Sequence, residues 1–368
     1  MASSAHLTRT SFADLDGWAV DSVAPALTAF RRSAAFAKEK PYRTGSLGIS
    51  PLDFAEAYQA ALALNTADEG QARNLFETHF VPFLLRPSDW EMGFVTGFYE
   101  PVVQASPERT ERFRFPLLRR PHDLLDIDDS NRPDEFDPSV AFGRQTNDGI
   151  VPYFDRAAID GGALDGRGLE LAWLADPVDL FFVHVQGAAR LAMPGGDMRR
   201  VTYAAKSGHP FTGPGGVLAN LGEIARGDVT MQAIRAWFKA HPDRIAEILH
   251  QNRSFIFFRE APVADPELGP VAAAKVPLTP GRSLAVDRLI HTFGTPFFVA
   301  ASTLSAVDNR LFARLMIAQD TGSAIVGPAR GDLFIGSGDA AGEVAGVIKH
   351  PARFTILVPK PAAERFGS

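Results

Sequence analysis

Three aspartates in the last third of the chain have the type and position for acid–base chemistry. Asp287, Asp320 and Asp332 each stand at the edge of an apolar run, and all three lie within 46 positions. A carboxyl group at the end of a strand can face a cleft, where partial burial raises its pKa towards that of a general acid. Asp320 is the foremost candidate, because only Gln319 separates it from the apolar run 315–318 and a buried carboxyl requires a reason. A lone aspartate in such a place is more often the cap of a strand or turn.

A second segment, 94–101, carries groups that suit a sugar-binding site. Thr96 offers a hydroxyl, Gly97 allows a close backbone approach, and Tyr99 offers a ring that can stack on a sugar. The same run also fits a strand whose aromatic side chains belong to the core. We therefore predict a strand here, with sugar contact as one of two interpretations.

A third segment, 180–187, is apolar almost throughout and is predicted as a strand that ends at Gln186 and Gly187. The amide of Gln186 could bridge the hydroxyls of a saccharide. His184 could titrate near neutral pH, although a lone histidine is more often a structural residue. The glycine turn at 206–209 is a weaker indication of the same kind, because a solvated lysine explains it as well.

The composition excludes several classes of function. There are 37 basic and 43 acidic residues, for a net charge of −6 without a basic tract, so nucleic acid is not an expected partner. Cysteine is absent, which rules out a thiol nucleophile, a disulfide and a cysteine-ligated metal. No run of ~18 apolar residues predicts a membrane span, and the first residues lack the apolar core of a signal peptide. The nine histidines show no metal-ligand spacing and no nucleotide loop is recognisable, so neither a metal nor an organic cofactor is expected.

The pattern of apolar residues and the content of glycine and proline change near residue 92. Before it, apolar residues at helical spacing predict three helical segments, the first of which, 14–36, has a break or kink at Pro25. After it, frequent glycine and proline indicate short strands, and 261–281 is predicted to be a linker or a long crossover. The predicted C-terminal strands cover 283–286, 296–300, 314–318, 334–335 and 354–358.

In this order the segments resemble the membrane-bound lytic murein transglycosylase A family, with its C-terminal three-aspartate domain. The resemblance extends from about residue 92 to 358. Its first motifs are VTGFYEPV at 95–102, FRFP at 113–116, VQG at 185–187, AKSGH at 205–209, MQAIR at 231–235 and NRSFIFF at 252–258. Its later motifs are VPL at 276–278, AVDR at 285–288, GT at 294–295, AQDTGSAIVG at 318–327 and GDLF at 331–334.

For the fold, the resemblance implies a mainly β protein with N-terminal helices. Residues 1–105 and 252–368 would form the helices and a double-psi β-barrel, with the three-aspartate part at 276–358. A smaller β-barrel-like domain would be inserted at 106–251. A groove between the two domains would hold a glycan strand.

For the chemistry, the resemblance implies a peptidoglycan lytic exotransglycosylase. It would cleave the β-1,4 bond between N-acetylmuramic acid and N-acetylglucosamine and leave a 1,6-anhydro end. The catalytic acid would be Asp320, with Asp287 and Asp332 as supporting acidic residues. The implied glycan contacts are Thr96, Gly97, Tyr99, Gln186, Gly187, Lys206 and Gly208.

The resemblance also implies binding partners and a location in the cell. Its partner would be the peptidoglycan glycan strand, besides proteins of wall synthesis or remodelling, and its location would be the periplasm, in association with the outer membrane. The lipid-bearing N-terminal cysteine of the family's lipoproteins is missing from this chain.

Two alternative functions stay open. An inverting glycoside hydrolase would pair Asp320 with Asp287 or Asp332 at roughly 6.5–9.5 Å, and a wall protein could bind glycans without cleaving them.

Overall fold

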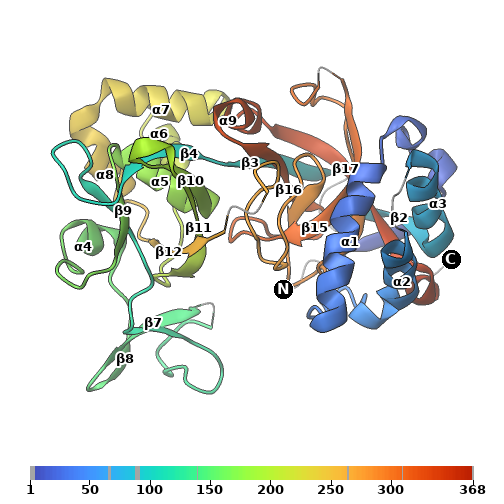
Figure 1. Cartoon of the computed structure of the whole chain (residues 1–368), viewed down its shortest axis with the longest axis horizontal. Helices are drawn as coiled ribbons and strands as arrows, with labels where there is room; N and C mark the ends of the chain where they lie inside the picture. The colour runs from blue at the N-terminus through green and yellow to red at the C-terminus, as the bar shows by residue number, and fades with distance from the viewer. Residues whose placement is uncertain are drawn as a thin grey trace. The chain divides into compact units, whose positions relative to one another are not determined.

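Two compact units make up the chain, one of residues 1–99 with 265–368 and one of residues 100–264. The computed structural model describes residues 5–64, 68–87, 92–138, 140–262, 265–308 and 310–366. Figure 1 shows the elements of both units, coloured along the chain. None of the helices in these ranges is long and apolar enough to cross a membrane.

Three helices precede the strands of the first unit, in the segments where helical spacing predicts them. They are α1 (Ala24–Glu39), α2 (Ala55–Ala63) and α3 (Glu69–His79). The predicted break at Pro25 is wrong, because the helix starts there: Pro25 lies in the first turn of α1, where its missing N–H costs no hydrogen bond. The buried side of α1, which includes Leu27 and Phe30, belongs to the core of this unit.

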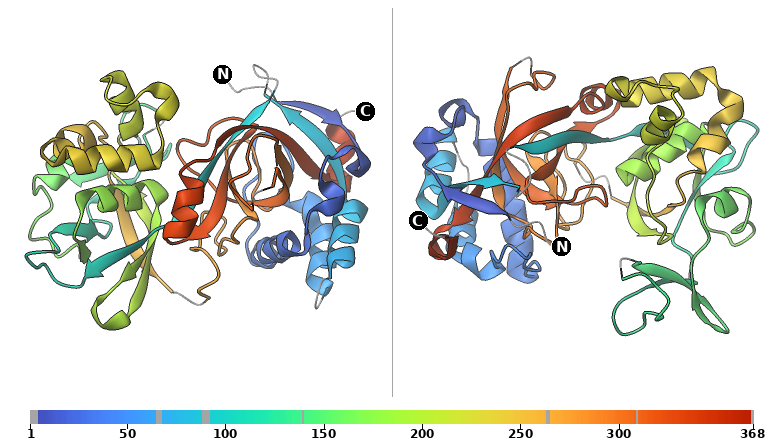
Figure 2. Two further views of the ribbon diagram at one scale, coloured as in Figure 1. Left: turned by 90° about the horizontal axis from the view of Figure 1, so that it is seen from above. Right: turned by 180° about the vertical axis from the view of Figure 1, so that it is seen from behind.

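The centre of the first unit is a closed β-barrel of six strands, seen end-on in the left panel of Figure 2. The strands are β3 (Gly93–Glu100), β13 (Ser283–Val286), β14 (Pro296–Ala301), β15 (Phe312–Asp320), β16 (Arg330–Ser337) and β17 (Lys349–Pro359). Around the ring their order is β3–β17–β14–β15–β13–β16, and β16 pairs with β3 again. The pair β13–β15 is parallel. Closure therefore brings β3 beside strands more than two hundred residues later in the chain.

Further elements extend this barrel. β17 also pairs with β2 (Phe80–Arg86), which pairs with β1 (His6–Arg9). Two short helices, α9 (Asp339–Ala345) and α10 (Lys360–Ala363), follow β16 and β17. Single 3-10 turns are formed by Phe12–Asp14, Trp18–Val20, Pro51–Phe54 and Glu364–Phe366.

The second unit is built on a six-stranded sheet in the order β12-β11-β10-β4-β9-β5. These strands are β4 (Val102–Ser106), β5 (Phe115–Leu118), β9 (Glu170–Leu174), β10 (Ala188–Ala192), β11 (Met198–Lys206) and β12 (Ile256–Ala261). A parallel bridge between Arg119 and Phe258 joins the two ends of this order, so the sheet closes like a small barrel. A separate three-stranded sheet consists of β6 (Leu124–Asp126), β7 (Phe142–Thr146) and β8 (Gly149–Val151).

One segment of the second unit corrects the sequence analysis. Residues 180–185, predicted as a strand, lie in the helix α5 (Pro177–Gln186). The side chain of Asp176 accepts a hydrogen bond from the backbone N–H of Val178 at 2.7 Å, and Gly187 ends the helix with φ +73°. The helix is buried on most of its surface, so its apolar run shows no helical periodicity, and its end signals decide the structure.

The other helices of the second unit are α4 (Arg156–Asp160), α6 (Pro214–Asn220), α7 (Met231–Ala240) and α8 (Ile245–Leu249). Its 3-10 turns are Pro194–Gly196, Arg226–Asp228 and Pro242–Arg244. α7 and α8 pack with α5 in one apolar cluster.

The expected fold class is confirmed: the chain is mainly β, with helices at the N-terminus, a barrel and a smaller β unit. The expected insert, 106–251, stays a prediction; the compact unit of residues 100–264 includes β4 and β12, which pair within its sheet. The groove between the domains stays a prediction.

Candidate active site

Asp320 is the last residue of β15, and a β-bulge sets its place. Along the parallel pair, Leu284 stands opposite Ala318 and Ala285 opposite Asp320, so Gln319 has no partner on β13. Gln319 is fully buried, and its amide donates to the Ala29 carbonyl of α1 at 2.8 Å. A bulge of this kind can re-aim a side chain at a sheet edge. Here it fixes the backbone in the core immediately before the candidate acid.

The environment of Asp320 favours the protonated carboxyl. Burial, opposed by hydrogen bonds from the backbone N–H groups of Thr321 and Ala273 and assisted by the charge of Asp332, raises the pKa of Asp320 to about 6. The N–H of Ala273 donates to Oδ1 at 3.2 Å. Within the described ranges no lysine, arginine or histidine forms an ion pair with this carboxyl, and the residue is only half-buried. It can therefore hold a proton close to neutral pH.

Asp332 lies across one strand from Asp320. Both aspartates stand opposite Ala285 on β13, one on β15 and the other on β16. Neighbouring strands are about 4.8 Å apart, so the two Cα atoms are separated by about 10 Å, with Ala285 of β13 between them. The pKa of Asp332 is raised by burial, against the opposing effects of a hydrogen bond from Thr96 and the charge of Arg330.

Thr96 and Arg330 join Asp332 in a hydrogen-bonded chain. Arg330 Nη2 donates to Thr96 Oγ1 at 2.7 Å, and the Thr96 hydroxyl donates to Asp332 Oδ1. The guanidinium also lies 5.7 Å from the ring centre of Phe94. Sequence reasoning missed Arg330. The available signal was its position two residues before Asp332 on one strand, which places both side chains on the same face.

Asp287 ties two loops together. Its Oδ1 accepts from the N–H of Leu289 at 3.0 Å, and its Oδ2 accepts from the N–H of Gly327 at 2.9 Å. The second loop, 321–329, begins directly after Asp320. These bonds give Asp287 a role in holding the loop that leaves the candidate acid.

Gly97 and Tyr99, expected as glycan contacts, pack against the region of α9. A Cβ atom on Gly97 would lie 2.8 Å from Ile348 Cδ1 and 3.0 Å from Ala345 Cα. The ring of Tyr99 covers Gly342 so closely that a Cβ atom there would lie 2.8 Å from Cε2, and Tyr99 is only 6% exposed. Close packing thus explains both Gly97 and the aromatic residue, and their contact with a sugar stays a prediction.

The remaining predicted contacts belong to the second unit. Gln186 ends α5, Gly187 is its left-handed cap, and Lys206 ends β11. Gly208 has φ +84°, and a Cβ atom there would lie 2.5 Å from the carbonyl oxygen of Phe142.

His184, the predicted titrating group, is buried in the second unit. Its Nδ1 lies 3.0 Å from Arg156 Nη2, and its ring packs edge-on against Phe255 at 4.5 Å between ring centres. Burial, reinforced by the Arg156 charge, holds the pKa of His184 well below its usual value. It is a neutral core histidine and does not titrate near pH 7.

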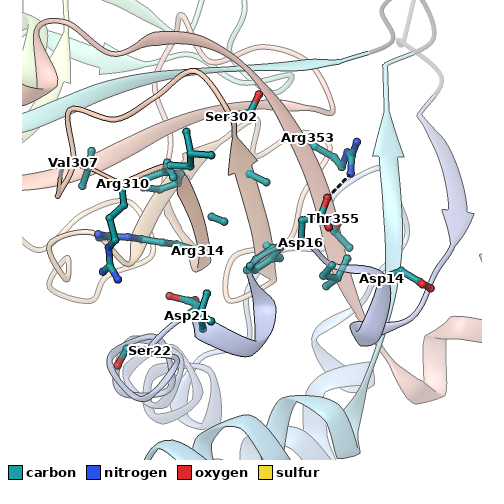
Figure 3. A pocket seen from close by; sticks show the side chains of 18 of the residues that line it. Asp14, Asp16, Asp21, Ser22, Ser302, Val307, Arg310, Arg314, Arg353 and Thr355 are labelled. Atoms are coloured by element: carbon teal, nitrogen blue, oxygen red, sulfur yellow. Dashed lines mark ion pairs between the residues drawn. The ribbon is translucent and has the colours of Figure 1, made fainter.

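A cavity of about 600 Å³ in the first unit lies at the opposite end of β15 (Figure 3). Arg314, six residues before Asp320, lines it, so the two are separated by about 20 Å along the strand. The ion pairs in this cavity are Arg314–Asp308, Arg310–Asp308, Arg353–Asp16 and Arg282–Asp21. Asp320 is not among the residues that line this cavity, so the candidate acid does not belong to it.

The described part of the chain contains no cluster of three His, Asp or Glu side chains placed to hold a metal ion. The groups brought together in the first unit are thus two carboxyls with raised pKa on either side of one strand, one of them tied to a hydroxyl and a cation. Such an arrangement can donate and recover a proton at a glycosidic bond.

Comparison with known proteins points to the same chemistry. Residues 94–259 match the MltA-specific insert domain, and residues 282–358 match the 3D domain. The crystal structure of the membrane-bound lytic murein transglycosylase from Agrobacterium tumefaciens is 51% identical, with a TM-score of 0.93 over 98% of this chain and 100% of that one.

Two relatives come from Escherichia coli. The curated membrane-bound lytic murein transglycosylase A of strain K12 is 33% identical over 273 residues, which cover 73% of this chain and 66% of the relative. The crystal structure of E. coli MltA with bound chitohexaose is 26% identical, with a TM-score of 0.70 over 98% of this chain and 95% of that one.

The matched domains and the similar solved structure place the chain among the lytic murein transglycosylases. The chain belongs to the membrane-bound lytic murein transglycosylase A family.

Proposed function

We propose that this chain is a peptidoglycan lytic transglycosylase that cleaves the β-1,4 bond between N-acetylmuramic acid and N-acetylglucosamine, with Asp320 as its acid and then its base. The observation that carries the proposal is the carboxyl of Asp320, half-buried, without an ion-pair partner in the described ranges and with a pKa of about 6. The relatives named for this activity and the chitohexaose bound to E. coli MltA support a glycan substrate.

The reaction needs only one titrating group for both proton transfers. The neutral Asp320 carboxyl gives its proton to the glycosidic oxygen as the bond to the anomeric carbon breaks. The resulting carboxylate takes the proton of the C6 hydroxyl of N-acetylmuramic acid, whose oxygen bonds to the same anomeric carbon. That hydroxyl is tethered to the reacting centre, so its effective concentration is high and no water is required. The products are a 1,6-anhydro end and a free 4-hydroxyl.

The backbone around Asp320 suits this double role. The carboxyl of Asp320 accepts hydrogen bonds from two backbone N–H groups, those of Thr321 and Ala273, and the second of these goes to Oδ1. The N–H bonds stabilise the carboxylate that exists between the two transfers.

The glycan would be acted on where peptidoglycan lies, in the periplasm, in association with the outer membrane and with other proteins of wall remodelling. The names of the relatives, which are membrane-bound murein transglycosylases, support this location.

Substitution Asp320→Asn tests the proposal, because the amide keeps the shape of the carboxyl but carries no acidic proton. We expect the variant to fold and to lose clearing of purified murein sacculi by at least 10³-fold, the upper part of the range for general acid–base catalysis. The control is Asp16→Asn, whose side chain is 94% exposed and which should clear sacculi like the wild type. Mass spectrometry of the wild-type products should find anhydro ends. Wild-type clearing by Asp320→Asn would refute the assignment, and water-added reducing ends would indicate the inverting hydrolase instead.

A further inference from the structure

We propose that Arg330 is a positioning residue of this site: acting through the Thr96 hydroxyl, it holds Asp332 as an anion opposite Asp320 and so keeps the catalytic proton on Asp320. The inference rests on the proposed function. It adds a residue two positions before the third aspartate, and it changes the role of Thr96.

The direction of the hydrogen-bonded chain is fixed by the groups in it. An arginine side chain can only donate, and Arg330 Nη2 donates to Thr96 Oγ1 at 2.7 Å. The single hydroxyl proton of Thr96 is then directed to Asp332 Oδ1. A chain of this polarity strengthens both bonds and stabilises the ionised form of the carboxyl at its end.

The barrel holds Arg330 in place from several sides. Its guanidinium contacts the carbonyl oxygen of Gly331 and lies over the ring of Phe94, a contact that stabilises a cation. Phe94 and Thr96 share one face of β3, two residues apart, as Arg330 and Asp332 do on β16. The two strands are neighbours only because the barrel closes there.

The positive charge of Arg330 favours the ionised form of Asp332. Burial alone would drive Asp332 to take a proton, whereas the Thr96 hydrogen bond and the Arg330 charge oppose that. An ionised Asp332 in turn makes ionisation of Asp320 harder. The other charged or titratable groups on the elements packed against β16 and β3 are Glu100 at the end of β3, Lys349 (opposite Thr96), His350 and Arg353 on β17, and Asp339 and Glu343 on α9.

The hydrogen-bonded chain from Arg330 through Thr96 to Asp332 also limits the hydrogen bonds that Thr96 can make with a substrate. Its one proton goes to Asp332 and one of its two lone pairs accepts from Arg330, so a single lone pair is left. A sugar hydroxyl can therefore donate to Thr96 but cannot accept from it. This narrows the glycan contact expected from the sequence to one direction.

The test is the pH dependence of kcat/KM for Arg330→Gln on soluble murein glycan, between pH 4 and 8. Without the cation, Asp332 takes a proton more easily, its repulsion of Asp320 disappears, and Asp320 ionises at lower pH. We expect the alkaline limb of the profile to move by about one pH unit to lower pH. The value of kcat/KM at pH 7.5 should then fall about tenfold, because at pH values above the limb a shift of one pH unit lowers kcat/KM by a factor of ten. At pH 4.5, which lies below the limb, kcat/KM should stay within about twofold of the wild type.

Conservative variants separate this role from a structural one. Arg330→Lys keeps the charge, and Thr96→Ser keeps the hydroxyl, so both should leave the limb near its wild-type position. Thr96→Val breaks the chain and should move the limb in the same direction as Arg330→Gln. Arg353→Gln is the matched control, because this arginine lies on β17 in the same sheet, its side chain is 58% exposed, and its ion pair is with Asp16 at 3.8 Å.

Loss of activity by one factor at every pH, or a limb that stays in place or moves to higher pH, would overturn the proposal. Thermal unfolding of each variant checks that it is folded, and if Arg330→Gln is not, the pair Thr96→Val and Thr96→Ser decides. The outcomes for the two proposals are distinguishable. An active Asp320→Asn variant overturns the proposed function, whereas an inactive one together with an unmoved limb in Arg330→Gln overturns the role of Arg330 alone.

Discussion

Replacing Asp320 by asparagine should make the protein more stable at neutral pH, and the pH dependence of this gain tests the environment assigned to the carboxyl. The pKa of Asp320 rises from an ordinary value of 3.8 to about 6 in the folded chain. Between these values the native state binds a proton that the unfolded state has lost, so the free energy of unfolding falls as pH rises through this window. The asparagine side chain does not titrate, so the free energy of unfolding of this variant does not fall over the same pH window on account of position 320.

The magnitude follows from the same pKa values. A difference of about two pKa units is worth about 3 kcal/mol, and solvent that reaches the half-buried side chain reduces it, which leaves about 1–3 kcal/mol. The amide oxygen can still accept the N–H of Ala273, so little is lost in exchange. For a unit of about 200 residues this corresponds to a melting temperature higher by about 3–10 °C.

The assay is denaturant or thermal unfolding of the wild type and Asp320→Asn from pH 3.5 to pH 8. The two proteins should unfold alike below about pH 4, diverge between pH 4 and pH 6, and keep a constant difference above about pH 6.5. Asp16→Asn, the exposed control, should follow the wild type throughout. A difference that does not depend on pH, or an asparagine variant that is no more stable at pH 7.5, would show that this carboxyl is not held in a protonating environment.

Two further predictions concern the surroundings of the site. In Asp287→Asn, the single amide oxygen can accept only one of the N–H groups of Leu289 and Gly327. The free energy of unfolding, measured with denaturant, should therefore fall by about 1–3 kcal/mol. An unchanged unfolding midpoint would contradict the role of Asp287 in holding the loop. Gly342→Ala would place a Cβ atom 2.8 Å from the ring of Tyr99 and should lower stability by about 1–3 kcal/mol in the same measurement. If Gly342→Ala left the free energy of unfolding unchanged, α9 would have to move away from the ring of Tyr99 without a loss of stability.

The sequence was most informative where a local rule acts alone. The apolar run 283–286 coincides with β13, and the run 315–318 lies inside β15, so the edge positions of Asp287 and Asp320 follow from local pattern. Helical spacing located the N-terminal helices, but the position of Pro25 within one turn decided between a kink and a helix start.

The run 180–185 shows where pattern reasoning fails. A continuous apolar run fits a buried strand and a buried helix equally well. Asp176, Pro177 and Gly187 mark the two ends of a helix, and these signals outweigh the β-type composition between them. The prediction of a strand followed the composition and neglected the ends.

By itself, the sequence determined which carboxyls stand at strand edges and that no thiol takes part in the chemistry, because both depend on residue identity and short-range pattern. Tertiary structure alone decided what surrounds those carboxyls. Thr96 reaches Asp332 across 236 positions, and Ala285 separates Asp332 from Asp320, only because the barrel closes and a bulge sets the register. The proton affinity of a carboxyl depends on its burial and on charges within several ångströms, and that environment is assembled from strands distant in the chain.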